Sequence, residues 1–319
     1  MKILIFGAGG VGSVVGGFLA RMGHEVSLLG RAWHLDQIKK QGLFITGIWG
    51  DYRIKAFNLF TSAAELGAAG PEFDLIILTV KSYDTAQAAE ELAPFMGPET
   101  MLLSLQNGLG NIEAILKHVR PEQFLAGRVI FGAELEAGVA KVTVNADDVV
   151  LGTLPGIHPK RSAVQTSHTL SLAGVPARAV TNILTYIWSK VIYNCALNGI
   201  CSLHKIPYGR ILEREDTREQ MKNVVRECYA VGLKAEVVLD PDMPEDFLDL
   251  LTGSLIPKTA AHFPSMLQDL KKGKRTDIDA LNGAIWRLGN ELGVPTPENQ
   301  KITQEIYRLS RSSPGVRIL

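Results

Sequence analysis

The chain has 319 residues, of which 46% are hydrophobic and 21% are charged, a composition that is ordinary for a soluble globular protein. Its 33 lysines and arginines balance its 33 aspartates and glutamates, so no net field favours nucleic acid or an anionic membrane as a partner. A chain of this length exceeds most single hydrophobic cores, and two domains are therefore expected.

Features of the N-terminus, the cysteines and the histidines predict a cytoplasmic protein. The start, MKILIFGAGG, has too short an apolar run for a signal peptide, and no window approaches the ~18 apolar residues of a membrane span. Cys195, Cys201 and Cys228 lack CxxC spacing and fit reduced core thiols. The seven histidines show no metal-ligand pattern, so no metal site is expected.

The first part of the chain alternates short apolar runs with helical patterns, which predicts a parallel sheet with helices on both faces. Strands are expected at Ile3–Phe6, Val26–Leu29, Leu75–Val80 and Met101–Leu105, and helices at Gly12–Met22 and Thr85–Phe95. Two β-rich stretches, Leu43–Phe60 and Val129–Leu151, are expected to add edge strands.

The strand signal ends near Ala177, and the remaining chain shows helical patterns separated by Pro and Gly. Besides the stretch around Trp188, helices are expected at Glu215–Val238, Glu245–Leu251, Lys258–Lys271, Ile278–Leu292 and Glu298–Leu309. We therefore predict an α/β domain at 1–177 and an all-α domain at 178–319, with a ligand cleft between them.

The segment GAGGVG, Gly7–Gly12, follows a predicted strand and opens a predicted helix, with the spacing GxGxxG. The first Gly allows a tight turn, the second lets the backbone approach a pyrophosphate, and the third lets helix and strand pack closely. The helix N-terminus adds unpaired N–H groups. This pattern predicts dinucleotide binding in a Rossmann-type domain; the alternative is a bare glycine-rich turn.

The second strand ends in VSLLGR, which has Arg31 where an NAD site would have an acidic residue. A guanidinium can pair with a 2′-phosphate through two hydrogen bonds, whereas a carboxylate would repel it. Arg31 therefore favours NADP, although a surface arginine in a βα loop is the simpler alternative.

Two further strand ends point to the same ligand edge of the sheet. Lys81 follows the run LTV, and Gln106, Asn107 and Gly108 follow LSL. Asn107 could bond the nicotinamide ribose or the substrate. Asn-Gly is also an ordinary turn pair.

The segment Trp188–Gly199, WSKVIYNCALNG, lies in apolar surroundings but carries Lys190, Asn194 and Asn198 at steps of four. Residues four apart share one helix face. A solvated stripe is one explanation, but this row is narrow, has no acid and uses Asn, which is unfavourable inside a helix. We predict a seam facing a cleft, with Lys190 donating the proton in ketone reduction and both Asn side chains beside the substrate.

Together these segments resemble the ketopantoate reductase family, the 2-dehydropantoate 2-reductases. The resemblance spans nearly the whole chain and rests on GAGGVG, Arg31, LTVKS, LQNGLGN, WSKVIYNCALN and SMLQDLKKGKRTDIDALNG. It implies NADPH-dependent reduction of a 2-oxo acid, 2-dehydropantoate to (R)-pantoate, on the route to pantothenate and coenzyme A. It also implies a helical domain like that of 6-phosphogluconate dehydrogenase.

The resemblance also implies site residues by position. Lys190 would be the proton donor, and the cofactor and substrate would each have their own set of contacts. The implied cofactor residues are Gly7, Ala8, Gly9, Gly10, Val11, Gly12, Arg31, Lys81, Asn107, Ala133 and Asp277. The implied substrate residues are Asn107, Asn194, Asn198 and Ser265.

Some positions depart from the family pattern. Asp277 stands where relatives usually have the longer Glu, and His262 and Pro264 stand where they often have Asn and a second Ser. Arg128 and Phe131 replace residues that are often small or polar. These departures bear on the pocket and not on the reaction type.

Two alternatives compete with this interpretation. A β-hydroxyacid dehydrogenase would also join a GxGxxG domain to a Lys-x-x-x-Asn helix, but Arg31 and the QNG strand end argue against it. A non-catalytic NADPH-sensing protein would keep the glycines but have no use for Lys190. The expected partner is a small 2-oxo acid, with neither nucleic acid nor membrane; the sequence leaves the oligomeric state open, with a homodimer as the assembly considered.

Overall fold

The structure, a computed structural model, describes residues 1–70, 72–157 and 160–312. The chain forms two compact units: 1–107 with 111–183, and 108–110 with the chain from Leu184 onward. The division falls at 183/184, whereas the sequence predicted a boundary at 177/178. The difference arises because the short strand β12 (Ala177–Ala179) pairs with β11 (Val149–Gly152) and so belongs to the first unit.

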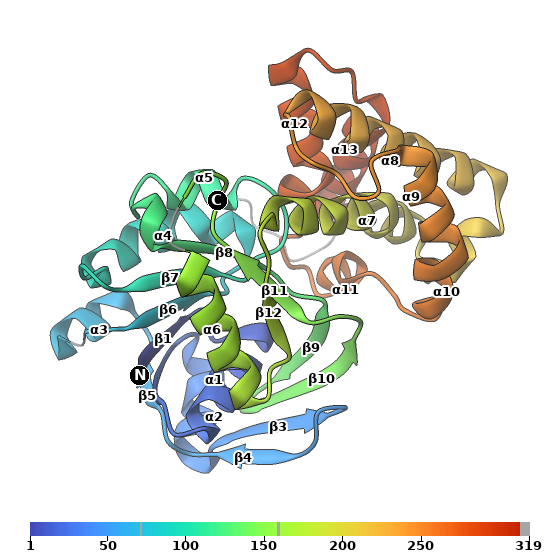
Figure 1. Ribbon diagram of the computed structural model, residues 1–319. Helices are drawn as coiled ribbons and strands as arrows, with labels where there is room; N and C mark the ends of the chain where they lie inside the picture. The colour runs from blue at the N-terminus through green and yellow to red at the C-terminus, as the bar shows by residue number, and fades with distance from the viewer. Residues whose placement is uncertain (71, 158–159, 313–319) are drawn as a thin grey trace. The chain divides into compact units, whose positions relative to one another are not determined.

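Eight of the described strands form the large sheet of the first unit, in the order β12-β11-β8-β7-β6-β1-β2-β5 (Figure 1). From β8 to β5 all neighbours are parallel. The bounds of these strands are β1 Lys2–Phe6, β2 Glu25–Leu29, β5 Asn58–Phe60, β6 Leu75–Leu78, β7 Met101–Ser104 and β8 Phe124–Arg128. The four predicted strands are all present. Their apolar runs are buried almost throughout, as in sheets covered on both faces.

A second sheet of four described strands has the order β4-β3-β10-β9. Its strands are β3 Leu43–Gly47, β4 Tyr52–Ile54, β9 Phe131–Glu136 and β10 Val139–Asn145. The prediction that both β-rich stretches add edge strands was therefore only partly right: β5 and β11 join the large sheet, and the rest form a sheet of their own. The parallel pairing of β3 with β10 joins segments far apart in sequence, which a local strand pattern does not specify.

The helices of the first unit include α1, which joins the two sheets. A Cβ at Gly17 of α1 would lie 2.5 Å from Ile45 of β3, so the glycine permits this close packing. Helix α6 packs on β11, β12 and α1. The bounds are α1 Gly10–Arg21, α2 Ala32–Gln41, α3 Ala63–Ala69, α4 Thr85–Leu92, α5 Asn111–Ile115 and α6 Lys160–Ala173.

Among the described residues of the second unit, helices and 3-10 turns alternate with short connections and no strand occurs. Its helices are α7 Ile183–His204, α8 Glu215–Lys234, α9 Pro244–Leu250, α10 Ile256–Lys258, α11 Ser265–Lys271, α12 Asn282–Leu292 and α13 Pro297–Ser312. The predicted helix Lys258–Lys271 is wrong, because α10 ends at Lys258 and α11 begins only at Ser265. Pro264 restricts the backbone of the residue before it and ends the possibility of a continuous helix there.

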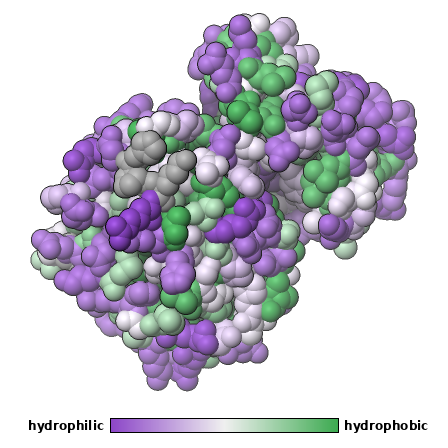
Figure 2. All heavy atoms as spheres, in the orientation of Figure 1, coloured by the Kyte–Doolittle hydropathy of each residue, from purple (hydrophilic) through white to green (hydrophobic). Residues whose placement is uncertain are grey.

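The hydrophilic surface and the properties of the helices agree with a composition in which acidic and basic residues are equal in number. None of the described helices combines the length and the apolar character that a membrane span requires. The face drawn in Figure 2 is mostly hydrophilic, with hydrophobic atoms in scattered spots.

Candidate active site

The glycine-rich loop between β1 and α1 lies at the carboxyl ends of the parallel strands, where open α/β sheets bind ligands. Gly7 has a φ of 110°, and a Cβ there would lie 2.7 Å from the Val80 backbone nitrogen. The N–H groups of Gly7 and Ala8 donate to the Leu29 carbonyl oxygen at 3.0 and 2.8 Å. The loop is therefore tied to the ends of both strands that flank β1.

The helix that follows is packed tightly against this loop. A Cβ at Gly12 would lie 2.3 Å from the Gly7 carbonyl oxygen and 2.5 Å from Thr79 Oγ1. The Thr79 hydroxyl donates to that same Gly7 oxygen at 2.6 Å. The sequence analysis did not single out Thr79 as a residue of this loop. The only available signal was that Thr79 lies in the segment LTVK at the end of a predicted strand.

Ala133 lies beside the loop, although it comes from β9 of the small sheet. A Cβ at Gly10 would lie 2.7 Å from the Ala133 carbonyl oxygen. The structure thus brings the Ala133 backbone to the first turn of α1, and its contact with the cofactor stays a prediction.

These residues fit a dinucleotide. Gly9 is the residue before α1, and the first-turn N–H groups of a helix lack intrahelical acceptors. Together with the positive end of the helix dipole they favour a phosphate. The missing side chain at Gly9 leaves the backbone open to close approach by the pyrophosphate, since a Cβ there would meet no atom nearer than 4.0 Å, whereas Gly7, Gly10 and Gly12 allow close packing within the protein.

Arg31 is the residue before α2, directly past β2, and it is exposed. The preceding Gly30 packs against the loop, since a Cβ there would lie 2.8 Å from the Ala8 Cβ. The backbone of Arg31 therefore lies next to the loop Gly7–Gly12 and at the N-terminus of α2. An exposed guanidinium in that place fits a phosphate monoester such as the 2′-phosphate of NADP.

The ends of β6 and β7 are joined by side-chain hydrogen bonds. Gln106 Nε2 donates to the Val80 carbonyl oxygen at 3.0 Å and to Thr85 Oγ1 at 2.7 Å. The carbonyl oxygen of Asn107 accepts from Ser82 Oγ at 2.6 Å. Lys81 and Asn107 are both exposed at this edge. The sequence predicted only that Gln106 follows a strand. In the structure its side chain cross-links the ends of β6 and β7.

Helix α7 carries the polar row predicted from the sequence. Lys190 and Asn194 are half-buried, while Asn198 is 5% and Ser202 0% exposed. A solvated stripe would be exposed along its length, so that alternative is wrong. The row runs from partly accessible positions into the interior of the second unit.

The remaining predicted positions lie at the starts of two short elements of the second unit. Ser265 is the first residue of α11 and is exposed; Asp277 is the first residue of the 3-10 turn Asp277–Ala280 and is half-buried. Within that turn, Asp279 accepts from Arg275 Nη2 at 3.1 Å and from the Tyr307 hydroxyl. These contacts hold the turn that carries Asp277.

The glycine of the QNG segment packs on this same turn. Gly108 has a φ of 86°, and a Cβ there would lie 2.5 Å from the Ala280 carbonyl oxygen. The Leu109 N–H donates to that oxygen at 2.8 Å. Both the positive φ and the close approach to Ala280 require glycine at position 108. Gly108 directly follows Asn107.

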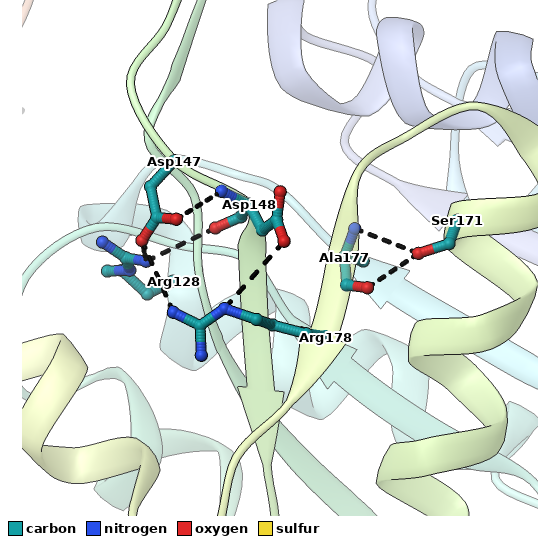
Figure 3. A network of polar contacts seen from close by, with 6 residues as sticks. All are labelled: Arg128, Asp147, Asp148, Ser171, Ala177 and Arg178. Carbon is teal, nitrogen blue, oxygen red and sulfur yellow. Dashed lines mark hydrogen bonds and ion pairs between the residues drawn. The ribbon is translucent and has the colours of Figure 1, made fainter.

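Arg128, one of the positions that depart from the family pattern, has a structural partner. Its side chain is 8% exposed, and Nη2 donates to Asp147 Oδ2 at 2.6 Å and to the Asp148 carbonyl oxygen at 3.3 Å (Figure 3). Arg178 of β12 lies 3.6 Å from Asp147 and 3.9 Å from Asp148. The group links β8, the turn before β11, and β12.

Comparison with known proteins decides the family. Residues 3–156 match the family described as ketopantoate reductase PanE/ApbA, and residues 182–309 match its C-terminal counterpart. The chain belongs to the ketopantoate reductase family. Ketopantoate reductases are NADPH-dependent oxidoreductases that act on a CH–OH group, and the loop geometry above agrees with that cofactor class.

Similar proteins extend over nearly the whole chain. A 2-dehydropantoate 2-reductase of Aquifex aeolicus is 37% identical over 307 residues, covering 96% of each chain. One from Pyrococcus horikoshii is 34% identical and covers 94% of each. A crystal structure of a ketopantoate reductase family protein from Ralstonia eutropha has a TM-score of 0.87 at 30% identity, covering 98% of this chain and 99% of the other.

One structural neighbour carries a different enzyme name. The ternary structure of D-mandelate dehydrogenase with NADH and anilino(oxo)acetate has a TM-score of 0.88 at 29% identity, covering 98% of this chain and 99% of that one. That structure contains NADH.

Proposed function

We propose that the protein reduces 2-dehydropantoate to (R)-pantoate with NADPH. Support comes from the two family matches and from relatives named 2-dehydropantoate 2-reductase that cover almost the full chain. The observation that carries the proposal is the row on α7, with one half-buried lysine followed by Asn194 and Asn198 at one-turn spacing.

In this proposal Lys190 supplies the proton and two asparagines hold the acid. NADPH, when bound, supplies the hydride for the ketone carbon. The Lys190 ammonium donates a proton to the ketone oxygen, a step for which positioned acid catalysis typically gives about 10²–10⁴-fold. Asn194, one helical turn along, and Asn198 beyond it bond the oxygen atoms of the substrate. Ser265 and Asn107 complete the substrate contacts.

The cofactor contacts follow the loop geometry. Backbone N–H groups of the loop Gly7–Gly12 hold the pyrophosphate, and Arg31 pairs with the 2′-phosphate. Lys81, Asn107 and the Ala133 backbone line the nicotinamide half of the site. Asp277 adds a carboxylate contact to the cofactor.

A substrate panel tests the reaction. Purified protein is assayed with 2-dehydropantoate, an aryl 2-oxo acid and a set of 3-hydroxy acids, each with NADPH and NADH. We expect the highest kcat/KM for 2-dehydropantoate with NADPH. Preference for 3-hydroxy acids would identify a β-hydroxyacid dehydrogenase, and tight NADPH binding without turnover of any acid would identify a sensor.

We also propose a cytoplasmic location, a place on the route to pantothenate and coenzyme A, and a homodimeric assembly. Cys195, Cys201 and Cys228 are buried free thiols, as expected in a reducing compartment. Sedimentation equilibrium at micromolar concentration tests the assembly, since a homodimer would give twice the mass of the chain.

A further inference from the structure

An asparagine that binds an anionic acid must present the correct end of its amide. The side chain has an accepting oxygen on one side and a donating NH₂ on the other, and a 180° rotation exchanges them. The ketone and carboxylate oxygens of a 2-oxo acid only accept. Asn198 can therefore bond a ketone or carboxylate oxygen of the substrate only if its amide is held with the NH₂ toward that oxygen.

The structure contains a group that holds this amide. Asn198 is buried in α7, and its Oδ1 accepts a hydrogen bond of 2.6 Å from the Tyr208 hydroxyl. Tyr208 is 4% exposed and begins the 3-10 turn Tyr208–Leu212 that follows α7. A short bond between two buried groups leaves little freedom for the amide to rotate.

We propose that Tyr208 is a positioning residue for substrate binding. Its hydroxyl holds the Asn198 side-chain oxygen on the side of Tyr208 and so directs the Asn198 NH₂ toward an oxygen atom of the 2-oxo acid. The inference rests on the proposed function, since it assigns to Tyr208 a role that acts through Asn198. Tyr208 does not itself touch the substrate.

The Tyr208 hydroxyl is suited to donate throughout the physiological pH range. Burial raises the pKa of Tyr208 well above its ordinary value, and the nearby Tyr193 and Cys201 raise it further. The phenol therefore stays protonated, and the bond to Asn198 does not switch with pH near neutrality.

The ring of Tyr208 is itself held from two sides. The Tyr193 ring meets it edge-on with centroids 6.0 Å apart, and the His262 ring lies at 5.3 Å. The Tyr208 N–H donates to the His262 carbonyl oxygen at 3.0 Å, and the Gly209 N–H donates to Ala260 at the same distance. His262, one of the departures from the family pattern, thus contributes to holding the tyrosine.

The same backbone contacts connect Asn198 to a second proposed substrate position. They fix the non-helical stretch between α10 and α11, and α11 begins with Ser265. Tyr208 therefore ties the inner end of the α7 row to the segment that presents Ser265.

The test is the variant Tyr208→Phe, which removes the hydroxyl and keeps the ring. We expect KM for 2-dehydropantoate to rise about tenfold, the usual cost of losing one buried hydrogen bond and its orientation, with kcat and the NADPH dissociation constant within about twofold. Tyr229→Phe is the matched control, because this buried tyrosine also donates a hydrogen bond from its hydroxyl, to the Pro241 carbonyl oxygen at 2.7 Å, and has no role in the proposed site. The control should leave KM unchanged.

A double-mutant cycle separates this inference from the proposed function. Asn198→Ala should raise KM, and adding Tyr208→Phe should change it by less than about twofold, because the tyrosine acts only through the amide. Additive effects, or a normal KM in Tyr208→Phe, would overturn the positioning role while leaving Asn198 in place. A normal KM in Asn198→Ala would instead remove Asn198 from the proposed site, and the inference with it.

Asn198→Asp provides a second route should Tyr208→Phe fail to fold. The carboxylate still accepts from Tyr208, but the donating NH₂ becomes a negatively charged oxygen. KM should then rise by more than about tenfold, since an anion is repelled. A KM near that of the unmodified protein would contradict the inference.

Discussion

At the scale of single residues, our proposal assigns the proton transfer to Lys190. Lys190→Ala should lower kcat/KM by at least about 100-fold, which equals about 2.7 kcal/mol of transition-state stabilisation, while NADPH binding changes little. Steady-state kinetics and cofactor titration measure the two effects. Lys222→Ala is the control, because this lysine of α8 pairs with Glu219 on the surface. A near-normal rate for Lys190→Ala would exclude it as the proton donor.

Arg31 decides the cofactor in our proposal. Arg31→Asp should weaken NADPH binding by about 10- to 100-fold and leave NADH binding nearly unchanged, because a carboxylate repels the 2′-phosphate that the guanidinium pairs with. Lys40→Ala, at the other end of α2, should alter neither. Titration with both cofactors measures the preference, and equal losses for both would mean that Arg31 supports the loop rather than reading the phosphate.

Residues of the site differed in how far the sequence could predict them. The glycines and Lys190 stand in spaced patterns, and chemistry restricts which residues can fill such patterns. Thr79 and Tyr208 were missed because each acts through one hydrogen bond to a residue in a different segment, to Gly7 and to Asn198. Nothing in the local sequence marks a threonine or tyrosine for such a bond.

At the scale of elements, two glycines of the loop between β1 and α1 are required for different reasons: Gly12 for packing and, in our proposal, Gly9 for cofactor binding. Gly12→Ala should destabilise the apo protein by about 1–3 kcal/mol, since its Cβ would clash with the Gly7 carbonyl oxygen at 2.3 Å. Gly9→Ala should leave apo stability unchanged, because the nearest atom to its Cβ is 4.0 Å away. It should nevertheless reduce the stabilisation by NADPH. Thermal unfolding with and without NADPH measures both, and equal apo melting temperatures would contradict the packing argument.

Elements also differed in how well they could be predicted. The four central strands were found because their buried runs are apolar at nearly every position. The small sheet was not, because β3 finds its partner β10 about a hundred residues later, and pairing at that distance leaves no local signal. The helix predicted at Lys258–Lys271 is interrupted, because α10 ends at Lys258 and α11 begins only at Ser265, directly after Pro264.

At the scale of the whole molecule, the group around Arg128 joins three segments at the β12 edge of the large sheet. It links β8 with the turn before β11 and with β12, the last strand before α7 (Figure 3). Burial works to raise the pKa of Asp147, but the hydrogen bond from Arg128 and the backbone N–H of Asp148 outweigh it, so the pKa is lowered from its ordinary value of 3.8. The carboxylate is thus favoured by folding.

This lowered pKa predicts how stability depends on pH. A group whose pKa is lower in the folded state stabilises the fold above its unfolded pKa, and this contribution is lost as the pH falls through the folded pKa. Asp147→Asn should therefore cost about 1–2 kcal/mol at pH 7, a value reduced from that of a fully buried pair because Asp147 is 41% exposed. Below about pH 4 the difference from the unmodified protein should shrink as Asp147 takes up a proton.

Asp148→Asn is the matched control for this pH dependence. Its carboxylate lies 3.9 Å from Arg178, and both side chains are more than two-fifths exposed, at 44% and 42%. Exposed pairs of this kind contribute at most about 1 kcal/mol, and often nothing measurable, so Asp148→Asn should unfold close to the unmodified protein at every pH. Denaturant unfolding between pH 7 and pH 3 measures both variants. Equal losses at pH 7 would show that general surface charge, and not the buried Arg128, gives Asp147 its effect on the whole fold.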